Sequence, residues 1–281
     1  NITSVQLYRD TNGDGALDGG DVLIGGAQTF TGNDGNATFN GLLETIIAGS
    51  TTNYLVVYNF SGNAAHNTTF GCSVFQNADV TATGSATGEN VNPVGAPAQS
   101  QNQTAKVLGS LQLTAGASNP GATSEREDAT DIEMLQINLA AGANAENIII
   151  SSITLTATGT IDDAADIDSL RLYHDMNNDG LLDGGDVQLG GPASFSVDDG
   201  SASFNGLNET IISGQNENWL LVYDLDGTAS HGETFGCSLA SNSNASVQGA
   251  DTSIAITPTG APVNGPAKTC LLYTSPSPRD S

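Results

Sequence analysis

Two short acidic stretches of the chain carry oxygen-bearing side chains at matching intervals. The first begins at Asp10 and the second at Asp175, and each is twelve residues long. Asp or Asn stands at positions 1, 3, 5, 9 and 12, and glycine stands at position 6, where a metal-binding loop turns sharply. With the carbonyl of position 7 added, this spacing offers the roughly six to eight oxygens that a hard cation such as Ca²⁺ takes.

The predicted calcium ligands are the residues at positions 1, 3, 5, 7, 9 and 12 of each stretch. In the first stretch they are Asp10, Asn12, Asp14, Ala16, Asp18 and Asp21. In the second stretch they are Asp175, Asn177, Asp179, Leu181, Asp183 and Asp186. A solvated turn rich in Asp and Gly is the alternative interpretation. Five matched oxygen positions that occur twice favour the cation site.

The segments on both sides of each stretch have the pattern of strands. Residues 5–8 and 170–173 alternate before the loop, and residues 22–26 after it are too short and too rich in Gly for a helix. The loop itself resembles that of EF-hands, and more closely that of dockerins, which tend to carry Asp at position 12. Helices flank the loop in both families, whereas strands are expected on both sides of it here. The resemblance therefore covers the loop alone. It implies calcium and does not carry over the dockerin's protein partner.

The charge balance of the chain excludes some classes of partner. The sequence has 6 Lys and Arg against 31 Asp and Glu, and its net charge is −25. Nucleic acids and anionic membranes bind through Lys and Arg patches, so we expect neither as a partner. No run approaches the roughly 18 apolar residues of a membrane span. Abundant Gly, Thr, Ser, Asn and Ala with almost no Lys is typical of a secreted bacterial or archaeal β-protein, which predicts an extracellular or cell-surface location.

An internal repeat sets the domain organisation. Residues 1–97 align without a gap with residues 166–262, an offset of 165 that fits a whole domain. Both copies end in Pro-, Gly- and Ala-rich stretches that we interpret as linkers. We therefore predict that residues 98–262 form a complete repeat, that 1–97 form the C-terminal part of a preceding one, and that 263–269 begin another. Residues 270–281 resemble a translated sequencing adapter and are not expected to pack.

Short alternating segments between turn signals fill the complete repeat, and none has sustained helical periodicity. We expect strands at residues 106–114, 131–140, 148–158, 169–174, 219–225, 234–239 and 253–257. A change of phase at Met134/Leu135 predicts a bulge, and the turn signal at residues 198–200 predicts a hairpin between 195–197 and 202–204. The predicted fold is all-β, with tandem antiparallel β-sandwich domains, immunoglobulin-like in the broad sense, each with an EF-hand-like calcium loop between strands.

Two cysteines occupy equivalent positions of the two copies. Each copy contains one of them, Cys72 in the first and Cys237 in the second, so neither has a disulfide partner in its own domain. Cys72 shares a strand face with Phe70 and Val74. We expect both thiols to be free, largely buried small hydrophobes.

The sequence contains no catalytic motif that we recognise, and we predict no enzyme. His66 and His231 are expected in solvated turns, and Trp219, replaced by Tyr54 in the other copy, is expected in the core rather than on a sugar-binding surface. Leu-Tyr before the loop, Asp-Gly-Gly-Asp-Val at its end and Leu-x-Val-Tyr further on resemble repeats of large bacterial surface and secreted proteins.

We predict a non-catalytic structural repeat of a stalk, adhesin or filament, stiffened by calcium, with neighbouring repeats, surface glycans or proteins as partners. The alternatives are a carbohydrate- or protein-binding module and a spacer attached to a secreted enzyme.

Overall fold

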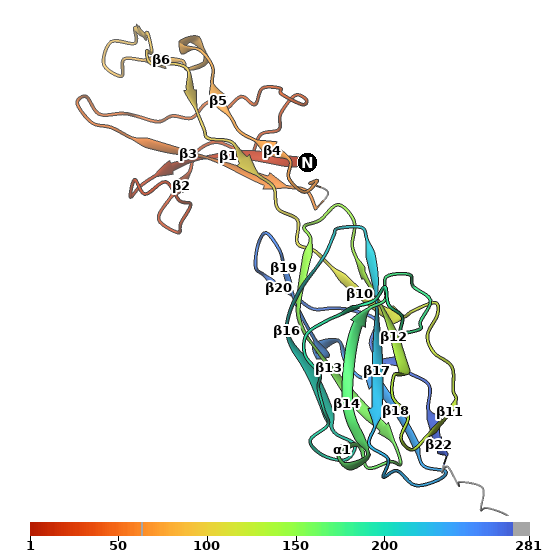
Figure 1. The fold of residues 1–281 in the computed structure, drawn as a ribbon. Helices are drawn as coiled ribbons and strands as arrows, with labels where there is room; N and C mark the ends of the chain where they lie inside the picture. Colours follow the sequence, from red (N-terminus) through yellow and green to blue (C-terminus); the bar gives the residue numbers. More distant parts are fainter. Residues whose placement is uncertain (63, 272–281) are drawn as a thin grey trace, which may run out of the picture. The chain divides into compact units, whose positions relative to one another are not determined.

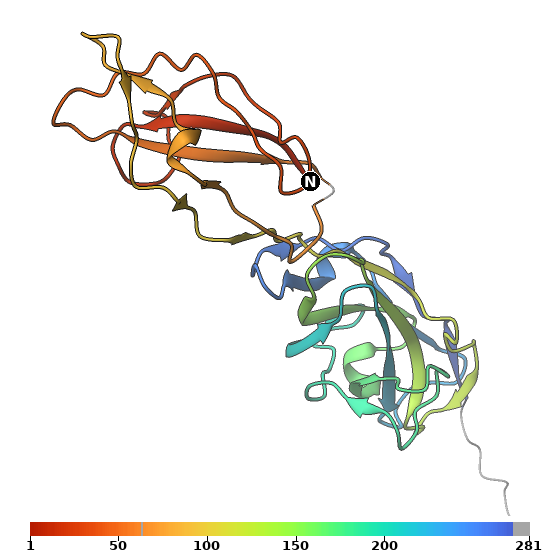
Figure 2. The same cartoon turned by 90° about the horizontal axis from the view of Figure 1, so that it is seen from above.

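The computed structural model describes residues 1–62 and 64–271, which form two compact units. The first unit runs from Asn1 to Ala105 and the second begins at Lys106 (Figures 1 and 2). Strands dominate both units and nearly all pair antiparallel, as the sequence predicts. None of the helices in the described residues has the length and hydrophobicity needed to cross a lipid bilayer.

The second unit consists of two sheets. The first sheet has the order β10-β12-β17-β14-β15. Its strands are β10 (Leu111–Ala115), β12 (Ile132–Ala141), β17 (Asn216–Leu225), β14 (Ile167–His174) and β15 (Val187–Gln188). The second sheet has the order β11-β22-β18-β13-β19-β20, with β16 also paired to β13 and β21 to β18. Its strands are β11 (Ser124–Arg126), β22 (Lys268–Leu271), β18 (Thr234–Leu239), β13 (Ile148–Gly159), β19 (Ala245–Gly249), β20 (Ala255–Ile256), β16 (Ser201–Ile211) and β21 (Val263–Asn264).

One hydrophobic core lies between these sheets. Trp219 and Tyr223 of β17 enter it from the first sheet, and Phe204 of β16 and Phe235 of β18 enter it from the second. Trp219 is fully buried, so its predicted place in the core is confirmed. The predicted bulge is also present, because the register of β12 against β17 shifts between Glu133 and Leu135. A short helix, α1 (Asp163–Asp166), and a 3₁₀ turn, η2 (Asn242–Asn244), complete the unit.

The first unit has one three-stranded sheet and three two-stranded ones. The larger sheet has the order β2-β1-β3, with β1 (Ile2–Asp10), β2 (Val22–Leu23) and β3 (Asn53–Phe60). The pairs are β4 (Thr69–Phe70) with β9 (Gln103–Thr104), β5 (Ser73–Val74) with β8 (Ala98–Gln99), and β6 (Ala82–Thr83) with β7 (Asn90–Val91). A 3₁₀ turn, η1 (Asn77–Asp79), lies before β6.

The backbone of the first unit recurs 165 positions later. β2, β7, β8 and η1 begin 165 residues before β15, β20, β21 and η2. The two cis peptide bonds, Ala96–Pro97 and Ala261–Pro262, keep the same offset. Equivalent sequence therefore adopts equivalent local backbone at these places.

The two units differ where the second has strands that the first lacks. In the second unit β16 pairs with β13 over its length. The equivalent residues of the first unit, 36–46, form no strand, because that unit has no counterpart of β13 to satisfy their backbone groups. Ile211 is 0% exposed at the end of β16, whereas the equivalent Ile46 is 56% exposed.

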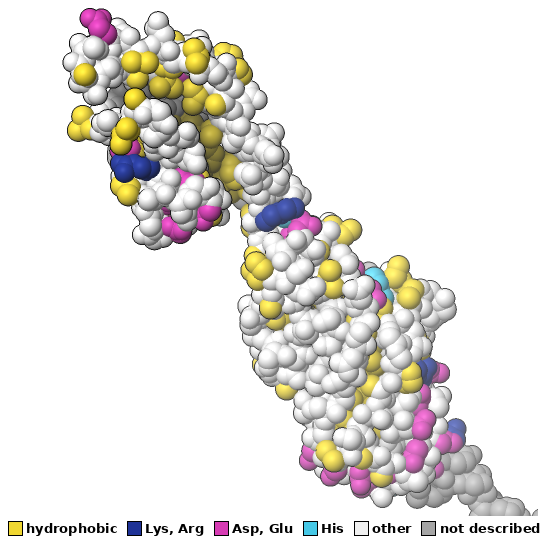
Figure 3. All heavy atoms as spheres, turned by 90° about the vertical axis from the view of Figure 1, so that its left-hand side faces the viewer, with side chains coloured by type: hydrophobic (Ala, Val, Ile, Leu, Met, Phe, Trp, Pro, Cys, Tyr) yellow, Lys and Arg dark blue, Asp and Glu magenta, His cyan; other side chains and the backbone are white. Residues whose placement is uncertain are grey.

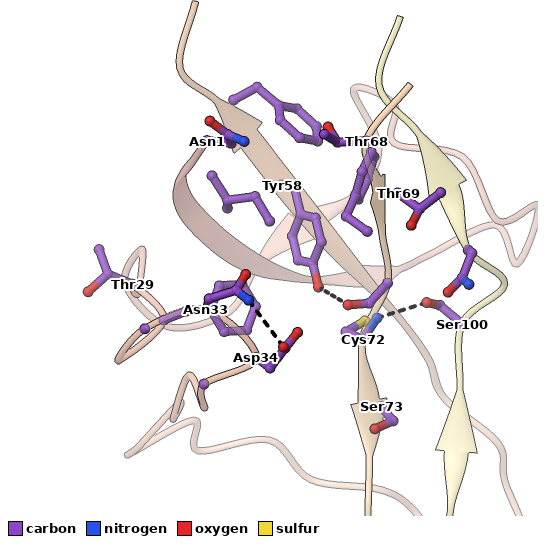
Figure 4. A pocket seen from close by; sticks show the side chains of 18 of the residues that line it. Asn1, Thr29, Asn33, Asp34, Tyr58, Thr68, Thr69, Cys72, Ser73 and Ser100 are labelled. Carbon is purple, nitrogen blue, oxygen red and sulfur yellow. Dashed lines mark hydrogen bonds between the residues drawn. The ribbon is translucent and has the colours of Figure 1, made fainter. Parts of the chain in front are cut away.

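This difference leaves an open cavity of about 880 Å³ in the first unit (Figures 3 and 4). Figure 3 shows hydrophobic side chains gathered in the hollow, and Figure 4 shows Tyr58 reaching into it. Phe30 and Tyr58 line it with their ring centroids 5.6 Å apart, as the equivalent Phe195 and Tyr223 meet at 6.0 Å in the core of the second unit. The cavity thus corresponds to the core of the second unit rather than to a ligand pocket.

Several sequence expectations differ from the structure. Residues 195–197 are not a strand, and β16 pairs with β13 instead of forming the predicted hairpin, since the chain crosses from one sheet to the other at this turn. The units divide after Ala105 rather than after Pro97, because β8 and β9 pair back onto β5 and β4. For the same reason residues 263–269 pair within the second unit instead of beginning another.

The expected adapter segment also differs in its first two residues. Cys270 and Leu271 end β22, and Cys270 is fully buried in the core, where the close packing accepts a small side chain. Residues 272–281 lie outside the described part of the chain.

The first prediction from this fold concerns Glu146, a buried carboxylate of the second unit. It is 1% exposed and accepts hydrogen bonds from the Thr252 hydroxyl (2.7 Å) and from the amides of Asp251 and Thr252 (both 2.8 Å). Burial alone would raise the pKa of Glu146, but these hydrogen bonds outweigh it and lower the pKa overall. The ionised form therefore stabilises the fold above the ordinary pKa of about 4.3, and this contribution is lost as the pH falls through the folded pKa.

We expect Glu146→Gln to lower the free energy of unfolding at pH 7 by about 1–3 kcal/mol and to flatten its pH dependence below about pH 4.5. Denaturant unfolding followed by fluorescence of Trp219 measures both effects, and the exposed substitution Asp168→Asn is the control. A Glu146→Gln variant that keeps the wild-type acid dependence would contradict the assignment.

The second prediction concerns the open face of the first unit. In a fusion protein that places residues 106–165 directly ahead of Asn1, we expect residues 36–46 to form a strand. The added copy of Ile153 would face Phe39, as Ile153 faces Phe204 in the second unit. Amide hydrogen exchange should then slow across residues 36–46. Leu155→Asp in the added segment is the control, and exchange that stays as fast as in the parent chain would refute the equivalence.

Candidate metal centres

Each predicted calcium loop connects two paired strands. The first loop joins β1 to β2, with Arg9 opposite Val22, and the second joins β14 to β15, with His174 opposite Val187. The glycine at position 6 has a left-handed backbone in both, with φ of +78° at Gly15 and +76° at Gly180. The loops are therefore turns between strands, as expected from their flanking sequences.

Asp175, at position 1 of the second loop, is fully buried at the end of β14. Its Oδ2 accepts hydrogen bonds from the side-chain amide of Gln136 on β12 (2.6 Å) and from the backbone amide of Gly180 (2.9 Å). Its Oδ1 is buried with no hydrogen-bond partner. An unsatisfied carboxylate oxygen is costly in a protein interior, so this atom is suited to a cation.

Asp10, the equivalent residue of the first loop, has a different set of partners. It is 7% exposed, and its two oxygens accept hydrogen bonds from the amides of Gly13 (2.6 Å) and Gly15 (3.1 Å). The first unit has no strand on the far side of β3 to supply a counterpart of Gln136. The carboxylate is therefore satisfied from within its own loop.

An asparagine amide links two carboxylates in each loop. The amide nitrogen of Asn177 donates to Asp179 (3.0 Å) and to Asp183 (2.9 Å). The amide of Asn12 contacts Asp14 (2.9 Å) and Asp18 (2.8 Å) in the same way. A rotation of either amide by a half-turn exchanges its nitrogen for its oxygen, so each of the three groups could present an oxygen to a hard cation.

The aspartate at position 12 closes each loop onto its own backbone. Asp186 accepts hydrogen bonds from the amides of Met176 (3.0 Å) and Asp183 (3.1 Å), one on each oxygen. Asp21 does the same with the amides of Thr11 (3.0 Å) and Asp18 (2.9 Å). In the described part of the chain, no hydrogen bond ends on the carbonyls at position 7, those of Ala16 and Leu181.

In neither loop do all the carboxylates lie close to one another. Among the described residues, one group of three carboxylates has ligand oxygens within 4.8 Å of one another, and it consists of Asp163, Asp198 and Asp199. Sequence reasoning assigned Asp199 to a turn and missed Asp163. The fold alone brings these residues together, and the only sequence signal was the Asp-Asp pair at 198–199.

The second loop makes hydrogen bonds to β12 and to the segment that precedes this strand. The hydroxyl of Ser118 donates to the carbonyl of Asn178 (2.9 Å), and the amide of Leu182 donates to Glu133 (3.2 Å). A Cβ added at Gly180 would lie 2.0 Å from the carbonyl oxygen of Ser118. This position therefore requires glycine both for its backbone angle and for space.

The two equivalent cysteines differ in burial. Cys237 is 1% exposed, and burial raises the pKa of its thiol to about 12, so it stays protonated at neutral pH. Its predicted burial is confirmed. The predicted burial of Cys72 is wrong in degree, because this residue is only partly covered at the open cavity of the first unit.

No protein-family model, curated protein or solved structure matches this chain.

The two loop glycines form a matched pair for a third prediction. A side chain at either position is strained by the left-handed backbone, which costs about 1–2 kcal/mol. Nothing lies within 4 Å of a Cβ at Gly15, whereas one at Gly180 would meet the backbone of Ser118. We therefore expect Gly180→Ala to destabilise the second unit by more than Gly15→Ala destabilises the first.

Hydrogen exchange of each unit in denaturant measures the two effects in one chain. Equal losses of stability in the two variants would show that the second loop does not pack against Ser118.

Proposed function

We propose that this chain is a calcium-stabilised structural repeat of an extracellular or cell-surface protein, without catalytic activity of its own. Calcium would bind in both twelve-residue loops, through the side chains at positions 1, 3, 5, 9 and 12 and the carbonyl at position 7. The ion would tie the ends of two paired strands together. The units would act as stiff, immunoglobulin-like elements of a stalk, adhesin or filament.

The observation that carries this proposal is the unsatisfied Oδ1 of Asp175. It belongs to position 1 of the loop, the first ligand position of a calcium site of this spacing, and it is fully buried. Gln136 and Gly180 donate hydrogen bonds to the other oxygen only. Ca²⁺ would supply the missing partner for Oδ1, and the carboxylates of Asp179 and Asp183 would add further oxygen ligands.

Other features favour a structural role over a binding or catalytic one. The single Trp of the chain is buried in the core, so it offers no platform on which a sugar ring could stack. The cavity of the first unit corresponds to packed core in the second. The recurrence of strands at an offset of 165 residues supports a chain built from repeated domains.

The expected contribution of calcium is local stiffening rather than formation of the fold. Extracellular modules bind calcium with dissociation constants of about 10⁻⁴–10⁻³ M. At ten times that concentration, linkage adds about 1.4 kcal/mol per site to the free energy of unfolding. The hydrophobic core of the second unit forms without this term, while the loop and the ends of β14 and β15 depend on it.

The fourth prediction tests this proposal on the whole chain. Trp219 is the single Trp, so its fluorescence reports unfolding of the second unit specifically. We expect the second unit to melt about 3–6 °C higher in 10 mM CaCl₂ than in chelator, because 1 kcal/mol corresponds to about 2–4 °C in a domain of this size.

The exposed double substitution Asp179→Asn/Asp183→Asn should lower this shift by the contribution of the loop, and Asp14→Asn/Asp18→Asn should leave it unchanged. If the wild-type chain melts at one temperature in calcium and in chelator, the second loop is a solvated turn and the proposal fails.

A further inference from the structure

The acidic group outside the loops lies where the chain crosses twice between the sheets of the second unit. The first crossing runs from β13 through α1 to β14, and it carries Asp163. The second runs from Ala193, which bridges to β14, to β16, and it carries Asp198 and Asp199. The amide of Asp199 donates to Oδ2 of Asp163 (3.1 Å), so both crossings meet at the same end of the unit.

Asp163 is buried at this end without full compensation. It is 0% exposed, and its Oδ1 has no hydrogen-bond partner. One of its oxygens lies within 4.8 Å of carboxylate oxygens of Asp198 and Asp199, which are exposed. The site therefore has one buried ligand with an unused oxygen and two ligands that face solvent.

No basic group offsets this charge. Within the described residues, none of the three aspartates forms an ion pair, and Arg171 is engaged with Asp131 and Asp224 instead. Burial, and after it the nearby carboxylates of Asp198, Asp199 and Asp162, raise the pKa of Asp163 to about 6, while the hydrogen bond from Asp199 acts in the opposite direction. Three carboxylates held this close repel one another unless a cation or a proton intervenes.

We propose that Asp163, Asp198 and Asp199 form a third cation site, which takes a hard divalent ion of the Ca²⁺ or Mg²⁺ class. The three carboxylates supply oxygen ligands, and water completes the coordination on the exposed side. The ion joins the two sheet crossings at one end of the second unit.

This site is separate from the calcium loop of the same unit. α1 directly precedes β14 and the loop directly follows it, so the eight residues of β14 separate the two, a span of about 26 Å at 3.3 Å per residue (Figure 1). Binding at one site therefore leaves the ligands of the other free.

The first unit provides a natural comparison. Its equivalent turn carries Asn33 and Asp34, and the amide of Asn33 donates to Asp34 (3.1 Å; Figure 4). A turn of the same backbone, with φ of 55° at Asp34 and 53° at Asp199, thus occurs with one carboxylate instead of two.

The test is calorimetric titration of the full chain with CaCl₂ and, separately, with MgCl₂. The background variant Asp14→Asn/Asp18→Asn/Asp179→Asn/Asp183→Asn disables both loops at exposed positions. We expect it to retain one site per chain, and the relative affinity for the two salts identifies the ion. Adding Asp198→Asn/Asp199→Asn should weaken that site at least tenfold, and adding Asp34→Asn should not change it. Asn33 occupies the position equivalent to Asp198, and Asn also tolerates the left-handed backbone of Asp199, so we expect the double substitution to preserve the fold. Asp163→Asn serves as a second variant.

The outcomes separate this proposal from that of the loops. If the wild-type chain binds two ions and the background variant binds none up to about 10 mM, the third site does not exist and the loop sites stand. If both chains bind one ion, and Asp198→Asn/Asp199→Asn removes it, the third site stands and the loop sites fail. Binding that survives both Asp198→Asn/Asp199→Asn and Asp163→Asn in the background variant overturns the assignment to these residues.

Discussion

A carboxylate buried without a full set of partners constrains the twelve-residue acidic loop of the second unit. Asp175 directly follows strand β14, it is fully buried, and one of its oxygens has no hydrogen-bond partner. Removal of a charge from water costs several kcal/mol unless hydrogen bonds or an opposite charge replace the lost hydration. Gln136 and Gly180 supply part of that replacement. The lost hydration that they do not replace is the physical reason to propose a cation in the loop.

This constraint depends on a strand that is distant in sequence. Gln136 reaches Asp175 because β12 pairs with β17, which in turn pairs with β14. In the first unit β3 has no such neighbour, and Asp10 takes its hydrogen bonds from Gly13 and Gly15. Two loops of the same spacing thus differ in the partners of their first aspartate, because a strand next to the central pair supplies Gln136 in the second unit only. The proposed calcium site is for this reason better supported in the loop of the second unit.

Local sequence patterns predicted the local features well. The alternation around the loops identified strands, the phase change at Met134/Leu135 identified a bulge, and the burial of Trp219 followed from an apolar strand. Each of these depends on a few neighbouring residues, for which the periodicity of side chains is sufficient. The left-handed glycines at loop position 6 belong to the same class.

Features set by pairing between distant segments were not predictable in this way. The turn at Asp199 has the sequence of a hairpin, yet β16 after it pairs with β13, and the segment before it bridges at Ala193 to the other sheet. Residues 36–46 and β16 are equivalent in sequence, yet only β16 has a partner strand. Asp163 and Asp198 are 35 positions apart, and nothing in the pattern of either predicts that they meet. One sequence does not reveal which strands become neighbours, and these sites depend on that choice.

The most direct measurement of the central claim is a crystal structure of the chain grown in millimolar calcium, with anomalous data collected at long wavelength. We expect an anomalous peak about 2.3–2.6 Å from Oδ1 of Asp175, surrounded by oxygens of Asn177, Asp179, Leu181, Asp183 and Asp186. A water molecule hydrogen-bonded to Oδ1, with no anomalous peak in the loop, would contradict it.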